Sequence, residues 1–150
     1  MEAPGDGRAD GIPLTPGDAE GELLWLDEPL SFWGGTDLAT GVITDVHHPQ
    51  CGTSLAGRVV VMSASRGSSS SSSVLAEQIR SGVGPAAMLL ASRDAIVALG
   101  ALAAAEVYGV QMPIVLTDAV GVPRAGRVRV SATEESAVVL WRACGTSAAV

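Results

Sequence analysis

The sequence predicts an α/β fold, in which a mixed sheet is built around a central βαβαβ unit. Three apolar runs of strand length are typical of strands buried on both faces: Arg58–Met62, Ala86–Leu90 and Ile114–Leu116. Two helical stretches lie between them, Val74–Arg80 and Arg93–Tyr108, and Gly109 is the expected stop of the second. This succession predicts parallel strands joined by right-handed crossovers.

Short antiparallel β elements are expected on both sides of this unit. The N-terminal candidates are three short apolar or aromatic runs: Leu23–Leu26, Ser31–Trp33 and Val42–Ile43. On the C-terminal side, Arg127–Ser131 alternates as a half-buried strand does, and Val138–Trp141 is expected to pair with it as a hairpin. Residues 1–10 carry charge and glycine without periodicity, which predicts a disordered tail and one domain over residues 11–150.

The composition excludes several classes of partner. The 150 residues include 9 basic side chains, all of them Arg, and 16 acidic ones, so the formal net charge is −7. A nucleic-acid or anionic-membrane surface needs a clustered basic face, which this balance does not favour. The longest nearly uncharged apolar stretch, Ala95–Ala105, is too short to span a bilayer, which takes about 20 residues.

The predicted location is the cytoplasm. Residues 1–22 have neither the basic start nor the apolar centre of a signal peptide. Cys51 and Cys144 lie 93 positions apart with no metal-ligand spacing, and we expect both thiols to be reduced.

One loop of the central unit has an unusual composition. Ser65-Arg66-Gly67 is followed by six consecutive serines, Ser68–Ser73. A run of serines is typical of a flexible linker. This run, however, lies inside a βα unit, where connections usually take about 2–6 residues, and at the carboxyl end of a strand, where ligands bind open α/β sheets. Its later serines, Ser72 or Ser73, are expected to cap the next helix, whose first N–H groups attract an anion.

Three chemistries would use such a loop. A phosphate-binding loop ends in Gly-Lys-Ser/Thr, and this chain has no Lys. A serine nucleophile requires a Gly-x-Ser-x-Gly turn and a later His, whereas His47 and His48 precede the serines. The third chemistry is a serine alkoxide that acts as a general base, stabilised by N–H dipoles and a nearby cation.

Several motifs in order resemble one family. Gly67-Ser68-Ser69 on a strand-to-helix loop is similar to the Gly-Ser-Ser-Arg loop in the swivelling domain of aconitases and isopropylmalate isomerases. Four longer stretches resemble the small subunit, or swivel domain, of aconitase X: PLSFWGGTDLATGVITDVHHP (Pro29–Pro49), GRVVVMSASRGSSSSSSVL (Gly57–Leu75), IRSGVGPAAMLL (Ile79–Leu90) and MPIVL (Met112–Leu116). The resemblance covers about residues 11–132.

The resemblance implies a swivelling β/β/α domain that forms one half of a hydro-lyase. A separate large subunit would carry the iron–sulfur cluster or iron and most substrate ligands, so this chain is expected to bind no metal. Family members dehydrate cis-3-hydroxy-L-proline or mevalonate 5-phosphate. The scarcity of basic residues favours the unphosphorylated substrate and hence a pyrroline carboxylate product. The alternatives are a mevalonate 5-phosphate dehydratase small subunit and a non-catalytic swivel domain that moves between partners.

The same resemblance assigns site residues. The family's catalytic serine is the first after Arg-Gly, which is Ser68 here. Where the aconitase loop continues with an Arg, this chain has Ser70, and Arg66 is the nearest available cation. The substrate-binding candidates that surround this serine are the following: Arg66, Gly67, Ser69, Ser70, Gly34, Gly35, Asp37 and His48.

Other interpretations of these residues stay open. Gly34 and Gly35 with Asp37 also fit a simple tight turn, where glycine tolerates positive φ. Adjacent residues of a strand face opposite sides, so His47 and His48 do not suit one metal ion, and positioning of a loop is the preferred role. The aromatic pair Phe32-Trp33 beside the glycines is expected to anchor the interface with the large subunit.

Overall fold

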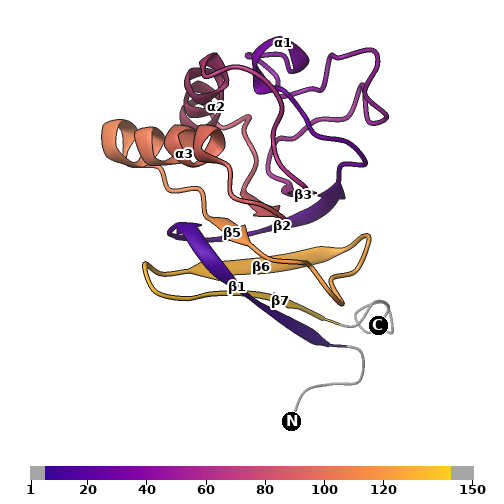
Figure 1. Ribbon diagram of the computed structural model, residues 1–150, viewed down its shortest axis with the longest axis vertical. Coiled ribbons are helices and arrows are strands. Elements are labelled where there is room, and N and C mark those ends of the chain that lie inside the picture. The colour runs from indigo at the N-terminus through magenta and orange to yellow at the C-terminus, as the bar shows by residue number, and fades with distance from the viewer. Residues whose placement is uncertain (1–5, 143–150) are drawn as a thin grey trace.

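Two long N-terminal strands connect the two halves of the sheet in the computed structural model, which describes residues 6–142 (Figure 1). β1 (Gly7–Thr15) pairs antiparallel with β5 and β7, whereas β2 (Gly17–Trp25) pairs parallel with β3 and antiparallel with β6. The strand order is β1-β5-β4-β3-β2-β6-β7, and the β7–β1 pairing closes it into a barrel.

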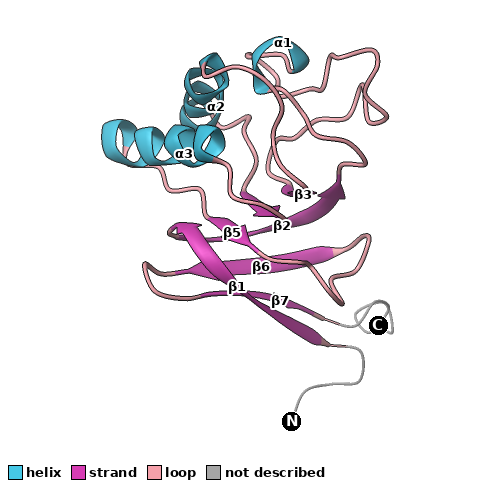
Figure 2. Cartoon of the chain, in the orientation of Figure 1, coloured by secondary structure: helices cyan, strands magenta, loops and turns pink. Residues whose placement is uncertain are grey.

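The predicted central unit is confirmed. β3 (Val59–Met62), β4 (Ala87–Leu90) and β5 (Ile114–Leu116) are parallel neighbours in that order. α2 (Ser70–Ser81) and α3 (Ala95–Tyr108) connect them, and both helices lie on one side of the barrel (Figure 2). Gly109 ends α3 in the left-handed conformation at φ 72°, as expected of a helix stop.

Alternation along the parallel strands creates two apolar cores. Val59 and Val61 of β3 pack inside the barrel against valines of β6 and β7, whereas Val60 and Met62 pack against α2 and α3. The strands are therefore buried on both faces, which explains their continuous apolar sequence. The result is the expected β/β/α layering, with the loops at the carboxyl ends of the strands available for a site.

The C-terminal hairpin is confirmed, whereas two of the three predicted N-terminal strands are not. β6 (Arg127–Ala132) pairs antiparallel with β7 (Ala137–Trp141). The predicted strand at Ser31–Trp33 is wrong, because this segment forms the short helical turn α1 (Phe32–Gly35). Val42 and Ile43 make only isolated bridges.

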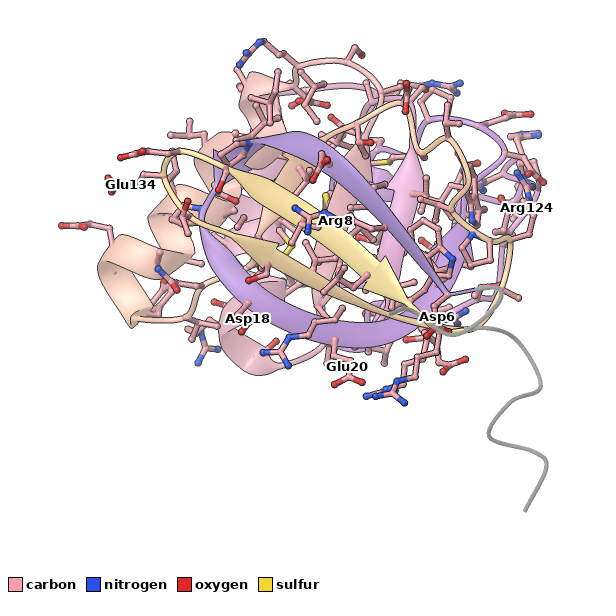
Figure 3. All side chains as sticks on the ribbon, turned by 90° about the horizontal axis from the view of Figure 1, so that it is seen from below. Asp6, Arg8, Asp18, Glu20, Arg124 and Glu134 are labelled. Atoms are coloured by element: carbon pink, nitrogen blue, oxygen red, sulfur yellow. The ribbon has the colours of Figure 1, made fainter. Side chains whose placement is uncertain are left out.

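The prediction of a tail over residues 1–10 is wrong for its last four residues, which begin β1 and pair with β7. The glycines there fit a strand because a side chain at Gly7 would collide with the Trp141 ring. Residues 1–5 lie outside the described part of the chain. The acidic segment that follows is the outer face of β2, where Asp18 and Glu20 point away from the barrel (Figure 3) and pair with Arg129 and Arg127.

Candidate functional site

The unusual loop joins β3 to α2 at the carboxyl end of the parallel strands, and we call residues 63–69 the serine loop. α2 begins at Ser70 rather than at Val74, so the last four serines of the run form its first turn. The run is thus divided between a loop and a helix. This arrangement is not that of a flexible linker, because most of the serines have defined contacts.

Ser68 stands at the start of α2 with its side chain exposed. Its Oγ accepts the N–H of Ser70 at 2.9 Å, and its carbonyl oxygen accepts the N–H of Ser71 at 3.0 Å. The N-cap of α2 is Ser69 and has no side-chain cap hydrogen bond, so the expectation that Ser72 or Ser73 caps this helix is wrong. The backbone N–H groups of Ser68 and Ser69 find no acceptor within residues 6–142. An oxyanion on or beside Ser68 would meet several N–H donors.

Ser71 and Ser72 are buried and hold the first turn of α2 in place. Ser71 and Ser72 are 1% and 9% exposed. Ser71 Oγ accepts the backbone N–H of Trp33 at 3.1 Å, and Ser72 Oγ donates to the carbonyl oxygen of Ile96 at 2.7 Å. These bonds attach the first turn of α2 to α1 on one side and to α3 on the other.

The structure brings the glycine pair next to the serine loop. The N–H of Arg66 donates to the carbonyl oxygen of Leu30 at 2.9 Å. Gly67, at φ 109°, packs so closely on Ser31 that a Cβ would lie 2.9 Å from its Oγ. Gly34 has φ 85° and open space where a Cβ would point, as the tight-turn interpretation requires. Gly35 is buried, and its carbonyl oxygen accepts the N–H groups of the 44–45 segment.

Two candidates use their polar atoms locally instead. Asp37 Oδ1 accepts the N–H of Ala39 at 2.8 Å, which closes a turn. His48 is buried at 5% exposure. Its Nδ1 accepts the N–H of Gln50 at 3.0 Å, so the other nitrogen, Nε2, carries the proton and donates to the Glu28 carbonyl oxygen at 3.0 Å. The geometry favours a loop-positioning role for His48, and both nitrogens of the ring are engaged.

A buried carboxylate at this edge escaped the sequence analysis. Asp94 precedes α3 and is 8% exposed. Its Oδ1 accepts the N–H groups of Ile96 and Val97, and its Oδ2 accepts both the N–H and the Oγ–H of Ser65. Burial would raise the pKa of Asp94, but the hydrogen bonds from Ser65 and the helix N–H groups outweigh burial and lower the pKa. An acidic residue before an apolar helix was the available signal.

Two arginines in the loops at this edge of the sheet, Arg66 and Arg93, have side chains without a partner in the described part of the chain. Within residues 6–142, the side chains of Arg66 and Arg93 have no ion-pair or hydrogen-bond partner. Arg66 lies in the serine loop and Arg93 in the loop after β4, and both are exposed. Both loops leave the carboxyl edge of the parallel strands, where an anionic substrate would approach.

A small pocket opens elsewhere on this edge. It has a volume of about 160 Å³, and its polar lining includes Ser63, Thr117 and Asp118. None of the site residues expected from the sequence lines it. Its walls come from the ends of β2 to β5, and of the serine loop only the first residue, Ser63, lines it.

The described residues contain no metal-binding set. Within residues 6–142, no three His, Cys, Asp or Glu side chains gather closely enough to hold a metal ion, and Cys51 is an exposed free thiol. Cys144 lies outside the described residues. No helix in the described part of the chain is both long and apolar enough to cross a membrane.

Comparison with known proteins identifies relatives of this arrangement. The sequence profile of the aconitase X swivel domain matches residues 8–139. A cis-3-hydroxy-L-proline dehydratase from Pseudomonas aeruginosa is 48% identical over 101 residues, 67% of this chain and 17% of that protein. One from Hypocrea jecorina is 39% identical over 106 residues, 71% of this chain and 18% of that protein. The chain therefore spans less than a fifth of the length of these two relatives.

Other relatives match it almost end to end. The phosphomevalonate dehydratase small subunit from Thermococcus gammatolerans is 35% identical over 131 residues, 87% of this chain and 95% of that protein. The crystal structure of aconitase X from Thermococcus kodakaraensis, in its holo-form, matches with a TM-score of 0.78 at 30% identity. That match covers 90% of this chain and 99% of the solved one.

Proposed function

The chain belongs to the aconitase X swivel domain family, and on this premise we propose that it is the small subunit of a two-subunit hydro-lyase. The relatives named above are dehydratases, and one of them is a separate small subunit of nearly the same extent. The partner would be a large subunit that binds most of the substrate. A non-catalytic swivel domain remains the alternative of a different class.

Ser68 is the proposed general base. The observation that carries this assignment is its position: an exposed hydroxyl at the N-terminus of α2, with Oγ already accepting the N–H of Ser70. A serine oxygen removes a carbon-bound proton only if its negative charge is stabilised. The Ser70 N–H and the positive end of the helix dipole supply that stabilisation. Oγ would take the proton from the carbon next to the substrate carboxylate.

Substrate binding is proposed for the exposed groups around this oxygen. The Arg66 guanidinium has no partner within the described residues and suits a carboxylate. The backbone of Gly67 and the hydroxyls of Ser69 and Ser70 are exposed beside it. Gly34 is exposed, with open space where a Cβ would point, so this turn offers no side chain that would block a substrate.

The partner would supply the metal centre. The family relationship suggests an iron–sulfur cluster, which would assist departure of the hydroxyl group. The described residues of this chain do not fit such a cluster, because they contain no suitable ligand set. We therefore assign it to the large subunit and restrict the role of this chain to proton removal and substrate orientation.

We propose cis-3-hydroxy-L-proline as the substrate, with mevalonate 5-phosphate as the alternative. Two observations oppose each other here. Identity is higher with the hydroxyproline dehydratase, at 48% against 35%. The match to the phosphomevalonate dehydratase small subunit, in contrast, covers more of this chain, 87% against 67%. The net charge of −7 favours the substrate without a phosphate group.

The experiment is reconstitution. The chain and the large subunit from the same source should be co-expressed, purified as a complex and assayed with each substrate. We expect turnover of hydroxyproline by the complex and none by this chain alone. Turnover by the isolated chain would contradict the two-subunit proposal. If the complex acts only on mevalonate 5-phosphate, the substrate assignment changes to that compound.

The interface is proposed on the face that carries the serine loop. Three exposed apolar side chains lie on the segment between β2 and β3: Trp33, Leu38 and Val46, which are 58%, 49% and 79% exposed. The fully buried Phe32 belongs to the core, so the expectation that it anchors the interface is wrong.

Trp33→Ala should weaken the complex about tenfold or more, as expected for an interface tryptophan. The fold should be unaffected because this side chain is exposed. Val107→Ala, at the far end of α3, is the matched control with 67% exposure. Equal dissociation constants for the two variants, measured by titration of the large subunit, would place the interface elsewhere.

A further inference from the structure

The first turn of α3 holds the start of the serine loop. The two carboxylate oxygens of Asp94 accept hydrogen bonds from different elements. Oδ1 caps α3 by accepting the N–H of Ile96 at 3.0 Å and that of Val97 at 3.3 Å. Oδ2 accepts the N–H of Ser65 at 2.6 Å and its Oγ–H at 2.5 Å. One buried side chain therefore serves a helix and a loop that lie 29 residues apart.

The same turn of α3 also holds the first turn of α2, which follows the serine loop. Ser72 Oγ donates to the Ile96 carbonyl oxygen at 2.7 Å. The two helices cross closely at this point, because Gly100 of α3 has no side chain. A Cβ at Gly100 would lie 2.9 Å from the Ser72 carbonyl oxygen and 3.2 Å from Leu75. α2 thus begins on a fixed support.

Between these two attachments lies an exposed stretch that ends before the buried Ser71. Residues 66–70 are all exposed, and this stretch contains Ser68. On the α1 side it is held by the N–H of Arg66, which donates to Leu30, and by the packing of Gly67 on Ser31. The position of the Ser68 oxygen therefore depends on how firmly Ser65 is held.

We propose that Asp94 is a positioning residue, which fixes the serine loop through Ser65 so that Ser68 Oγ stands ready to remove the substrate proton. The proposal rests on the function proposed above, and Asp94 itself does not touch substrate. A carboxylate suits this site because Ser65 directs two donors, its N–H and its O–H, to one oxygen. An asparagine whose oxygen caps the helix would turn an NH₂ group toward the Ser65 N–H, which cannot accept a hydrogen bond, whereas the Ser65 hydroxyl could rotate to accept one.

Asp94→Asn separates the two roles. Asparagine is as good a helix cap as aspartate, so α3 should keep its cap through Oδ1. The loop loses its acceptor. Ser65→Ala removes only the Oγ bond and should show a smaller effect in the same direction. The control for general destabilisation is Thr15→Val, because Thr15 Oγ1 is buried and makes two bonds to the segment that leads into β5, at Met112 and Ile114.

The first measurement needs no enzymatic activity. Trypsin cuts after Arg66, in the exposed part of the loop, and the full chain without its partner leaves that bond accessible. Asp94→Asn should speed cleavage after Arg66 about tenfold or more, the change expected when hydrogen bonds to a charged group are lost. Cleavage after the distant Arg124 should stay as in wild type. Equal acceleration by Thr15→Val, or no acceleration at all, would overturn the proposal.

The second measurement uses the reconstituted complex. Asp94→Asn should lower kcat about tenfold or more with little change in KM, because a small displacement of a reacting group reduces the rate more than binding. Thr15→Val should keep wild-type kcat. If Ser68→Ala is inactive while Asp94→Asn keeps its kcat, the positioning role is refuted. If Ser68→Ala is itself fully active, the proposed function has failed, and the cleavage rates still decide whether Asp94 holds the loop.

Discussion

Ser68–Ser70 form an exposed half of the serine run and Ser71–Ser72 a buried half, before the exposed Ser73 ends the run, although all six residues are chemically identical. Ser68, Ser69 and Ser70 are exposed, whereas Ser71 and Ser72 are almost fully buried. The difference arises where the loop becomes a helix, since each helical residue turns by about 100° and brings the next two serines against α1 and α3. Backbone position thus assigns the role of each serine, and the two halves should respond differently to the same substitution.

Ser68→Ala should have the largest effect. Removing the proposed base should lower kcat of the reconstituted complex by a factor on the order of 10²–10⁴, with KM largely kept. The variant also loses the acceptor for the Ser70 N–H, which costs about 1 kcal/mol of stability as the loss of one hydrogen bond. Ser68→Asn keeps a side-chain oxygen that can accept this N–H and should be equally inactive. Wild-type kcat in either variant, measured at saturating substrate, would reject the catalytic role.

Ser71→Ala should reveal the opposite behaviour of the buried half. It removes the acceptor of the Trp33 N–H and should reduce the free energy of unfolding by about 1–3 kcal/mol. The kcat of the folded complex should change little, because Ser71 faces α1 rather than the substrate. Urea unfolding and kcat should be measured on the same preparations. A stable but inactive Ser71→Ala protein would mean that the division between the halves is misplaced.

The sequence predicts the parts of the fold that depend on local pattern. The strands around Val60, Leu89 and Val115 are confirmed. They could be predicted because a short, continuous apolar run is typical of a strand buried on both faces. β1 was missed since its glycines, which make room for Trp141 and Val115, have the composition of a turn or tail. Barrel closure depends on pairing between residues more than 100 positions apart, such as Gly7 with Trp141, which no local pattern reveals.

The candidate site likewise has parts that the sequence predicted and parts that it did not. The serine loop and the Gly34-Gly35 turn were both identified, and the structure places the serine loop against Leu30 and Ser31, which lead into that turn. Their attachment to α3 was missed, because the expected helix began at Arg93 and hid Asp94 as its cap. The expected start of the preceding helix at Val74 was also too late, since α2 begins at Ser70 and its N-cap is Ser69. Such contacts depend on helix boundaries, which sequence patterns locate only to within a few residues.

Acid should weaken the attachment of the serine loop through Asp94. Burial opposes ionisation, but hydrogen bonds from Ser65 and the helix N–H groups lower the pKa of Asp94 below its ordinary value of 3.8. A lowered pKa stabilises the folded state above the unfolded pKa, and this contribution is lost as the pH falls through the folded pKa. Between about pH 7 and about pH 3, the wild type should therefore lose more unfolding free energy than Asp94→Asn.

Exposed pairs provide the control for this acid effect. The hydrogen bond from Arg129 lowers the pKa of Asp18, but that pair is exposed on the barrel and is screened by salt. Urea unfolding in high salt should therefore leave the difference at Asp94 and remove most of the difference between wild type and Asp18→Asn. Parallel pH dependences for wild type and Asp94→Asn would contradict the contribution of the buried carboxylate.

Ser73→Ala should have the smallest effect and tests whether exposure alone explains the exposed half. Ser73 is exposed, and its side chain has no hydrogen-bond partner within residues 6–142. It lies inside α2, directly after the buried Ser71 and Ser72 and five residues after Ser68. Alanine is the better helix former by about 0.5 kcal/mol, so thermal stability should be unchanged or slightly raised. The kcat should equal that of wild type. A loss of kcat like that of Ser68→Ala would show that Ser73 is needed as well, and the assignment of the base to Ser68 alone would then fall.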